Sequence, residues 1–320
     1  MLRRREFDTF DVRPVVRSNL SARRIVIKRN VRSVARELVV LLSVALVACS
    51  RDDSSGNPPA LPPGMVRQPS TNADASPPAV PFDAATPRVV AHAEANWPHD
   101  SAAYTQGLLV HEGHVLESTG IVGQSDVRRV DLTTGAVSNR VALPAPYFGE
   151  GIAVLGDRLY QLTWKEGRGF VHDLKTLAPV DSFTYTGEGW GLTTDGKRLY
   201  LSDGTSNIRV IDTAGFRVER TFQVTEAGKP VWFLNELEWV DGELWANVYQ
   251  TDFVARVNPA DGHVIGWIDL SALLIASQRE MVRTRGGVAN GIAADPAHQR
   301  VLFTGKLWPR VFAVPRDRLH

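Results

Sequence analysis

The 320-residue chain has a single cysteine, Cys49, and this scarcity limits its chemistry. A domain that begins after Cys49 has no thiol for a disulfide or for nucleophilic catalysis, so its hydrophobic core alone must stabilise it. The Gly-x-Ser-x-Gly motif of serine hydrolases is also absent. His111 and His114 in "HEGH" are too close together for a zinc-binding His-Glu-x-x-His motif. The remaining histidines are scattered along the chain: His92, His99, His172, His263, His298 and His320.

The chain also lacks a strong excess of charge. Its formal net charge is +1, but residues 1–48 contain eleven basic and only four acidic side chains. The remaining residues therefore carry 25 basic and 31 acidic side chains, a net charge of −6. A mildly acidic body offers no basic surface for nucleic acid, so we expect no nucleic-acid partner.

Long apolar runs are missing as well, apart from the eleven residues "LVVLLSVALVA" at 38–48. This run is too short to span a bilayer comfortably but suits the apolar part of an export signal, and Arg32 and Arg36 precede it. It ends in "LVAC", which resembles a bacterial lipobox with Cys49 as the lipidated residue. The alternative is a buried apolar helix with one free thiol.

These features predict three parts. Residues 1–49 form a signal and lipoprotein segment, in which 1–30 are expected to be an artefactual extension because the signal needs no more than the residues from about Val31. Residues 50–87 are rich in Pro, Ser, Ala and Asp and predict a flexible tether. Residues 88–320 form the folded domain, held at the cell envelope or in the periplasm by the lipid anchor alone.

Long amphipathic helices are nearly absent from this domain, and a repeat of short strands takes their place. A turn followed by an apolar strand recurs five times, as "GHVLES", "GDRLYQL", "GKRLYLS", "GELWANV" and "QRVLFTG". A second turn follows each copy, at "VDLTTG", "HDLKT", "IDTAG", "VNPADG" and "VPRDR". Such spacing fits one four-stranded blade per copy and predicts an all-β, five-bladed β-propeller. A β-sandwich is the alternative.

Two segments fall outside the repeat. The stretch "DLSALLIASQREMV", 269–282, has the one convincing helical pattern of the domain and predicts a helical excursion between blades four and five. The stretch 88–95 predicts a strand that completes the last blade beside "RVFAV" and so joins the two ends of the propeller.

The repeat also aligns residues at the start of each first strand, which lines the axis of a propeller. Equivalent positions should therefore form a ring at one mouth, and in this register they are Gln106, Glu150, Trp190, Asn235 and Asn290. A second ring traced through the next strand contains Gly120, Trp164, Gly204, Tyr249 and Lys306. Apolar walls with a few converging polar groups are typical of a pocket for a small molecule or a peptide end. One carboxylate without a metal motif favours metal-free proton transfer.

At these residues the sequence resembles the plant and bacterial type of glutaminyl-peptide cyclotransferase, also called glutamine cyclotransferase. The resemblance runs in order through residues 97–310. Its matching stretches are "PHDSAAYTQGL", "ESTGIVGQSDVR", "YFGEGIAV", "LTWKEG", "GEGWGLTTDG", "SDGT", "LNELEWVDGELWANVYQTD", "NGIA" and "TGKLWP".

The resemblance implies a five-bladed propeller that converts the N-terminal glutamine of a peptide or protein to pyroglutamate and releases ammonia, without a metal or other cofactor. It implies that Glu150 is the acid/base, with glycines on both sides leaving its carboxylate accessible, and that Lys306 stabilises the oxyanion. Asn235 and Gln106 would orient the substrate. Its aromatic walls would be Phe148, Trp164 and Trp190.

One position departs from the family pattern, since Tyr249 stands where many members have tryptophan, which leaves substrate preference open. Glu236 and Glu238 share a strand face, and at least one is expected to make structural hydrogen bonds. Trp245 is expected in the core. We expect a monomer. The competing hypotheses are a non-catalytic envelope propeller that binds a protein or peptide, and a propeller hydrolase, which would need several carboxylates around calcium.

Overall fold

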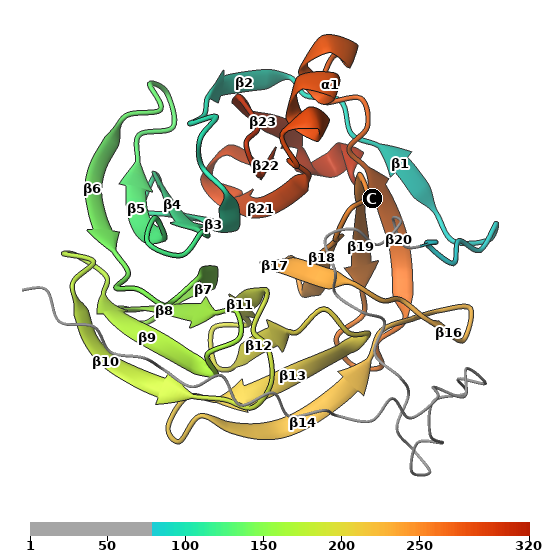
Figure 1. Ribbon diagram of the computed structural model, residues 1–320. Helices are drawn as coiled ribbons and strands as arrows, with labels where there is room; N and C mark the ends of the chain where they lie inside the picture. Colours follow the sequence, from blue (N-terminus) through green and yellow to red (C-terminus); the bar gives the residue numbers. More distant parts are fainter. Residues whose placement is uncertain (1–78) are drawn as a thin grey trace, which may run out of the picture. The chain divides into compact units, whose positions relative to one another are not determined.

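A computed structural model describes residues 79–320, and they form a five-bladed β-propeller (Figure 1). Each blade contains four antiparallel strands, one of which lies nearest the centre of the ring. The predicted fold class is thereby confirmed. The predicted signal segment, Cys49 and most of the predicted tether lie outside the described residues. Among residues 79–320, no helix is both long and apolar enough to cross a bilayer.

The first three blades follow the chain without interruption. Blade one contains β3 (Thr105–His111), β4 (His114–Thr119), β5 (Asp126–Val130) and β6 (Val137–Ala142). Blade two contains β7 (Gly149–Leu155), β8 (Arg158–Thr163), β9 (Arg168–Asp173) and β10 (Pro179–Thr184). Blade three contains β11 (Leu192–Thr194), β12 (Leu199–Ser202), β13 (Asn207–Asp212) and β14 (Arg217–Gln223).

The last two blades each take a strand from the beginning of the domain. Blade four contains β17 (Leu234–Val240), β18 (Glu243–Val248), β19 (Phe253–Val257), β20 (Val264–Asp269) and the added β1 (Arg88–Val90). Blade five contains β21 (Ala289–Asp295), β22 (Arg300–Gly305), β23 (Arg310–Pro315) and β2 (Ala95–Pro98). Short elements complete the domain: a hairpin of β15 (Thr225–Glu226) and β16 (Lys229–Pro230), and the 3-10 turns Pro296–His298 and Arg316–Arg318.

The ring of blades closes through different residues from those predicted. A single strand over 88–95 was expected beside β23, but β2 makes that antiparallel pairing, with Ala95 opposite Ala313. The earlier residues form β1, which runs parallel to β20 with Arg88 opposite Trp267. The segment therefore crosses from one blade to the next, and Ala91 is buried between the two pairings.

The folded domain also begins earlier than residue 88. Phe82, inside the predicted tether, packs edge-on against Phe253 and Trp267 with ring centroids 4.7 and 5.1 Å apart. The backbone N–H of Asp83 donates to the side chain of Glu226 at 3.0 Å. A single aromatic side chain thus anchors a segment whose average composition predicts a tether.

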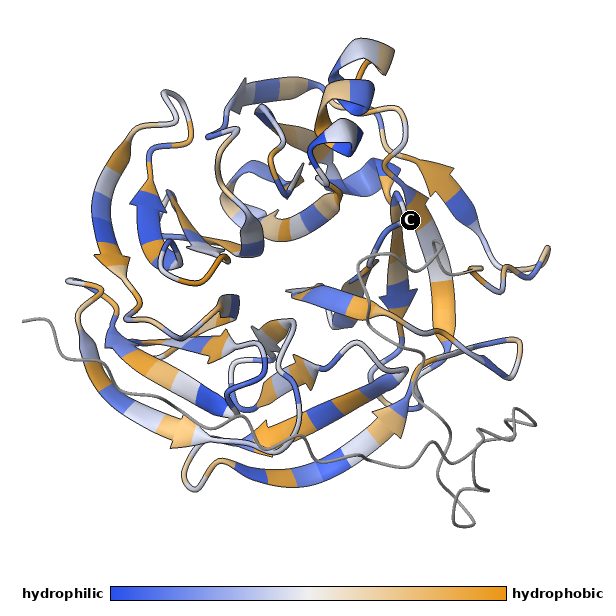
Figure 2. Ribbon diagram, in the orientation of Figure 1, coloured by the Kyte–Doolittle hydropathy of each residue, from blue (hydrophilic) through white to orange (hydrophobic). Residues whose placement is uncertain are grey.

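The predicted helical excursion lies between blades four and five as α1 (Ala276–Thr284), later than the predicted range (Figure 1). The first half of that range instead packs apolar side chains into the core next to Trp308, and these are Leu270, Leu273 and Leu274. Figure 2 shows apolar and polar residues alternating along the blade strands, as expected when alternate side chains are buried between blades. Trp245, predicted in the core, is fully buried.

Candidate active site

The residues predicted for the site line one cavity of about 230 Å³ at the mouth where the inner strands begin. Gln106, Glu150 and Asn235 are each the second residue of an inner strand, in β3, β7 and β17. The cavity is lined by Phe148, Trp164, Trp190, Tyr249 and Lys306 in addition to these three. Asn290 lies outside the lining, and its side-chain N–H donates to the carbonyl of Thr105 at 3.0 Å.

Two residues that line the cavity were missed from the sequence, Tyr104 and Ile121. Tyr104 directly precedes β3, so it stands outside the aligned inner-strand positions. Ile121 directly follows Gly120, a position of the second ring. This neighbouring position was the one signal in the sequence that could have placed Ile121 at the cavity.

The glycines on both sides of Glu150 have a packing role that the sequence did not predict. A Cβ at Gly149 would lie 2.7 Å from the carbonyl oxygen of Thr119, and one at Gly151 would lie 2.5 Å from the backbone nitrogen of Leu192. The two glycines therefore allow β7 to pack against backbone on either side. Glu150 itself is buried, with an exposed fraction of 4%, and it lines the cavity, where its carboxylate can meet a ligand.

Burial dominates the electrostatics of Glu150. It raises the pKa of the carboxyl well above its usual value, the nearby Lys306 charge opposes this shift, and the charges of Glu188 and Glu166 add to it. The side-chain N–H of Gln106 donates to Glu150 Oε1 at 3.2 Å. A carboxyl with a raised pKa can both accept and return a proton near neutral pH.

Lys306 follows β22 and brings its ammonium to the same cavity. The Nζ atom lies 4.8 Å from the ring centroid of Tyr104 and 5.1 Å from that of Tyr249. Within residues 79–320 this ammonium makes no hydrogen bond and no ion pair of 4.0 Å or less. Burial lowers the pKa of Lys306 to about 8, against the opposing effect of Glu150. A buried ammonium without a hydrogen bond or an ion pair can stabilise a negative charge that develops on a ligand.

Two of the aromatic walls are held in position by the carboxylate of Glu188, which was not identified from the sequence. Oε2 of Glu188 accepts both indole N–H groups, from Trp164 at 2.7 Å and from Trp190 at 2.8 Å. Trp164 follows β8 of blade two, and Trp190 precedes β11 of blade three. Glu188 therefore sets the position of one wall relative to the other. Phe148 extends the wall, with its ring centroid 5.6 Å from that of Trp164.

Two further groups face the same cavity. Oδ1 of Asn235 is buried and has no hydrogen-bond partner among the described residues, so it is available to a donor on a ligand. Tyr249, at the position that departs from the family pattern, shares a side-chain hydrogen bond with Tyr104. The rings of these two tyrosines are also the ones that the Lys306 ammonium faces.

Comparison with known proteins agrees with this arrangement. Residues 66–315 match the family described as Glutamine cyclotransferase. The chain belongs to this family. It is 45% identical to the curated glutaminyl-peptide cyclotransferase of Arabidopsis thaliana over 225 residues, and this alignment covers 69% of each chain. It is also similar to the crystal structure of Myxococcus xanthus glutaminyl cyclase, with a TM-score of 0.66 and 38% identity over 72% of this chain and 97% of that one.

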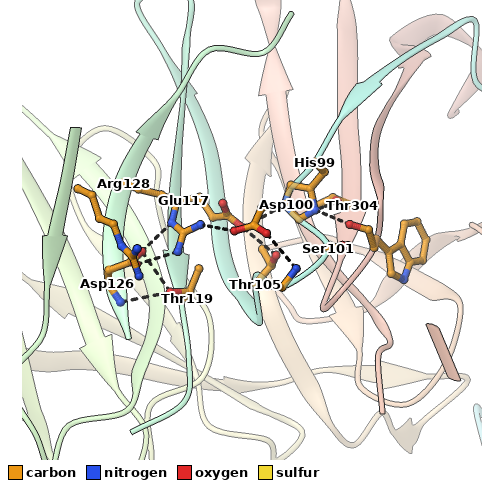
Figure 3. A network of polar contacts seen from close by, with 12 residues as sticks. His99, Asp100, Ser101, Thr105, Glu117, Thr119, Asp126, Arg128 and Thr304 are labelled. Atoms are coloured by element: carbon orange, nitrogen blue, oxygen red, sulfur yellow. Dashed lines mark hydrogen bonds and ion pairs between the residues drawn. The ribbon is translucent and has the colours of Figure 1, made fainter. Parts of the chain in front are cut away.

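In this member of the glutamine cyclotransferase family, a polar network that includes His99, Thr105 and Glu117 lies close in sequence to the site residues (Figure 3). Glu117 Oε1 accepts from Thr105 at 2.8 Å and lies 3.0 Å from Nε2 of His99, whose Nδ1 lies 2.7 Å from the carbonyl oxygen of Trp308. Burial alone would lower the pKa of His99, but Glu117 and the Trp308 carbonyl raise it overall. Because Thr105 precedes Gln106 and Trp308 lies two residues after Lys306, the network connects the two segments that carry these site residues.

Glu236, next to the site residue Asn235, makes hydrogen bonds to two other inner strands. The oxygens of Glu236 accept from the backbone N–H groups of Leu108 in β3 at 3.3 Å and Ile292 in β21 at 2.9 Å. Further along β17, Glu238 accepts from the N–H of Ala294 at 2.8 Å and lines a separate cavity that shares no residue with the first. Both glutamates thus make the structural hydrogen bonds that the sequence predicted for at least one of them.

Proposed function

We propose that the chain cyclises the N-terminal glutamine of peptides or proteins to pyroglutamate with release of ammonia, with Glu150 as the acid/base and without a catalytic metal. The observation that carries the mechanism is the cavity in which a carboxyl of raised pKa and an unpaired ammonium stand among aromatic walls. The names of the relatives from Arabidopsis thaliana and Myxococcus xanthus support the reaction. Metal independence is supported by the donor set, because residues 79–320 contain no group of three or more His, Cys, Asp or Glu side chains able to hold a metal ion.

The first half of the reaction forms the ring. The α-amine of the substrate attacks the γ-carbon of its own carboxamide, and a C–N bond forms while the carbonyl oxygen gains negative charge. Glu150 takes one proton from the attacking amine. The ammonium of Lys306 stabilises the oxyanion, which suits its lack of a partner among the described residues.

The second half expels ammonia. The C–N bond to the former amide nitrogen breaks, the carbonyl re-forms, and Glu150 returns its proton to the departing nitrogen, so that one carboxyl serves both transfers. The free Oδ1 of Asn235 accepts from the substrate amine, and Gln106 holds Glu150 through the 3.2 Å hydrogen bond. Phe148, Trp164 and Trp190 enclose the methylene groups of the glutamine and exclude water.

For location, we propose an exported monomer held at the cell envelope by lipidation of Cys49. The basic flank, the apolar run and the "LVAC" sequence support this proposal. Replacement Cys49→Ser should shift the protein from the membrane fraction to the soluble fraction. Retention of the variant in the membrane fraction would contradict the lipid anchor.

The test of activity is ammonia release from a glutaminyl dipeptide, with mass spectrometry of the product, with and without a metal chelator. We expect loss of the mass of ammonia from the peptide and a rate that the chelator does not change. Loss of activity with chelator would refute metal independence. A folded protein that turns over no glutaminyl peptide would instead favour a propeller that only binds peptide ends.

A further inference from the structure

Ile121, at the mouth of the cavity, has a backbone conformation that its side chain disfavours. Its φ is +81°, and it is the one β-branched residue among the non-glycine residues of 79–320 with positive φ. Left-handed φ is a genuine outlier for a β-branched side chain, and such conformations persist where the surroundings enforce them. A glycine would adopt this backbone freely, so the position retains an isoleucine side chain at a cost in strain.

Hydrogen bonds hold this conformation in place. The carbonyl oxygen of Ile121 accepts from the backbone N–H of Gln124 at 2.9 Å, and from the N–H and hydroxyl of Ser125 at 2.8 and 2.9 Å. Ser125 Oγ in turn accepts from the N–H of Gly149 at 3.0 Å, next to Glu150. The loop is thus fastened to the strand that carries the proposed acid/base.

The side chains of this loop form an apolar surface that extends outward from the cavity. Ile121 lines the cavity and is 37% exposed, and Val122 beside it is 52% exposed. The adjacent Gly120 lies against the Phe148 ring, because a Cβ there would come within 2.3 Å of it. Phe148 and Ile121 thus line the cavity, and the exposed side chain of Val122 comes directly after Ile121 in the same loop.

The size of the cavity determines which residue of a bound peptide can contact Ile121 and Val122. A volume of about 230 Å³ is below the roughly 300–1,000 Å³ of sites for drug-sized ligands, so the cavity accommodates about one amino-acid residue. If the N-terminal glutamine fills it, the second residue of the peptide lies at the mouth. We propose that Ile121 and Val122 are the subsite for the side chain of this second residue, and that they select glutaminyl peptides whose second residue is apolar. This inference rests on the proposed cyclisation.

The experiment compares kcat/KM for the dipeptide amides Gln-Leu and Gln-Gly in the wild type and in Ile121→Gly and Val122→Ser. In the wild type we expect roughly a 10-fold preference for Gln-Leu, the scale at which an apolar pocket discriminates small differences. Each variant should reduce the ratio toward one. Thermal unfolding of Ile121→Gly should occur at an unchanged or higher temperature because glycine relieves the strain at φ +81°.

The matched control is Val180→Ser on β10, since Val180 is 54% exposed but lies on the outer strand of blade two. This variant should retain both the activity and the ratio of the wild type. A wild type that cyclises both peptides equally, or variants that keep its preference, would overturn the subsite while leaving the cyclase in place. Absence of turnover on every glutaminyl peptide would remove the proposed function and the subsite with it.

Discussion

Replacement of Glu188 separates the positioning of the aromatic walls from the effect of charge on Glu150. In Glu188→Ala, the indole N–H groups of Trp164 and Trp190 lose the carboxylate oxygen to which both donate. A hydrogen bond to a charged acceptor contributes about 1.5–3 kcal/mol, and the partial exposure of Glu188 reduces this to about 1 kcal/mol for each indole. If both are lost in the bound complex, the total of about 2 kcal/mol corresponds to a decrease of roughly 30-fold in kcat/KM.

In Glu188→Gln, the amide oxygen can still accept from both indoles, so the walls keep their positions while the charge disappears. The Glu188 charge contributes to the raised pKa of Glu150, although burial is the larger cause. Its removal lowers that pKa, and since Glu150 must be ionised to take a proton, the variant should stay active to lower pH than the wild type. The assay is kcat/KM for a glutaminyl dipeptide as a function of pH, with thermal unfolding as a check on folding. An alanine variant within twofold of the wild type, or a glutamine variant whose acid limb moves to higher pH, would refute this reasoning.

Changes at three residues, Glu150, Lys306 and Glu236, test the remaining parts of the site. Glu150→Gln should fold normally and lose roughly 10²- to 10⁴-fold in rate, the usual contribution of a positioned acid/base; near-normal turnover would remove Glu150 from the mechanism. The pKa of Lys306, about 8, predicts that wild-type activity falls as pH rises through this value, and Lys306→Arg should shift that fall to higher pH; an unchanged alkaline limb in Lys306→Arg would assign it to another group. Lys306→Met should abolish turnover without lowering the unfolding temperature, because the ammonium is buried without a hydrogen bond or ion pair among residues 79–320; a large loss of stability would indicate a structural lysine. Glu236→Ala should lower the free energy of unfolding by about 2–5 kcal/mol in denaturant titration, since it leaves the N–H groups of Leu108 and Ile292 unbonded, whereas the exposed Glu280→Ala on α1 should have almost no effect; equal stability of the two variants would contradict the bridging role.

The sequence was sufficient for the fold class and for most of the residues that share the cavity, because the repeat aligns one position in each inner strand. Gln106, Glu150 and Asn235 are equivalent in the repeat and meet at one mouth. Identifying them required no knowledge of side-chain contacts, since the symmetry of a propeller brings equivalent positions together.

The sequence was insufficient where a contact depends on the approach of separate blades. The role of Gly151 follows from how closely β7 approaches the backbone at Leu192, and a turn or an exposed side chain was an equally valid explanation of the glycine. From the sequence alone, Glu188 has the features of a solvated loop residue. Its role follows from the structure, in which the indole N–H groups of Trp164 and Trp190 both donate to it. Phe82 lies in a segment whose composition predicts a tether, and only the aromatic rings of blade four show why it is anchored.

The small size of the cavity has a consequence for the order of events in turnover. Its volume of about 230 Å³ accommodates about one amino-acid residue, so substrate and product cannot occupy it together. Pyroglutamyl product must therefore leave before the next glutamine enters, and the two compete for the same cavity. Product should accordingly act as a competitive inhibitor, and on a folded protein substrate the departure of the modified terminus, rather than ring formation, can set the pace of the cycle.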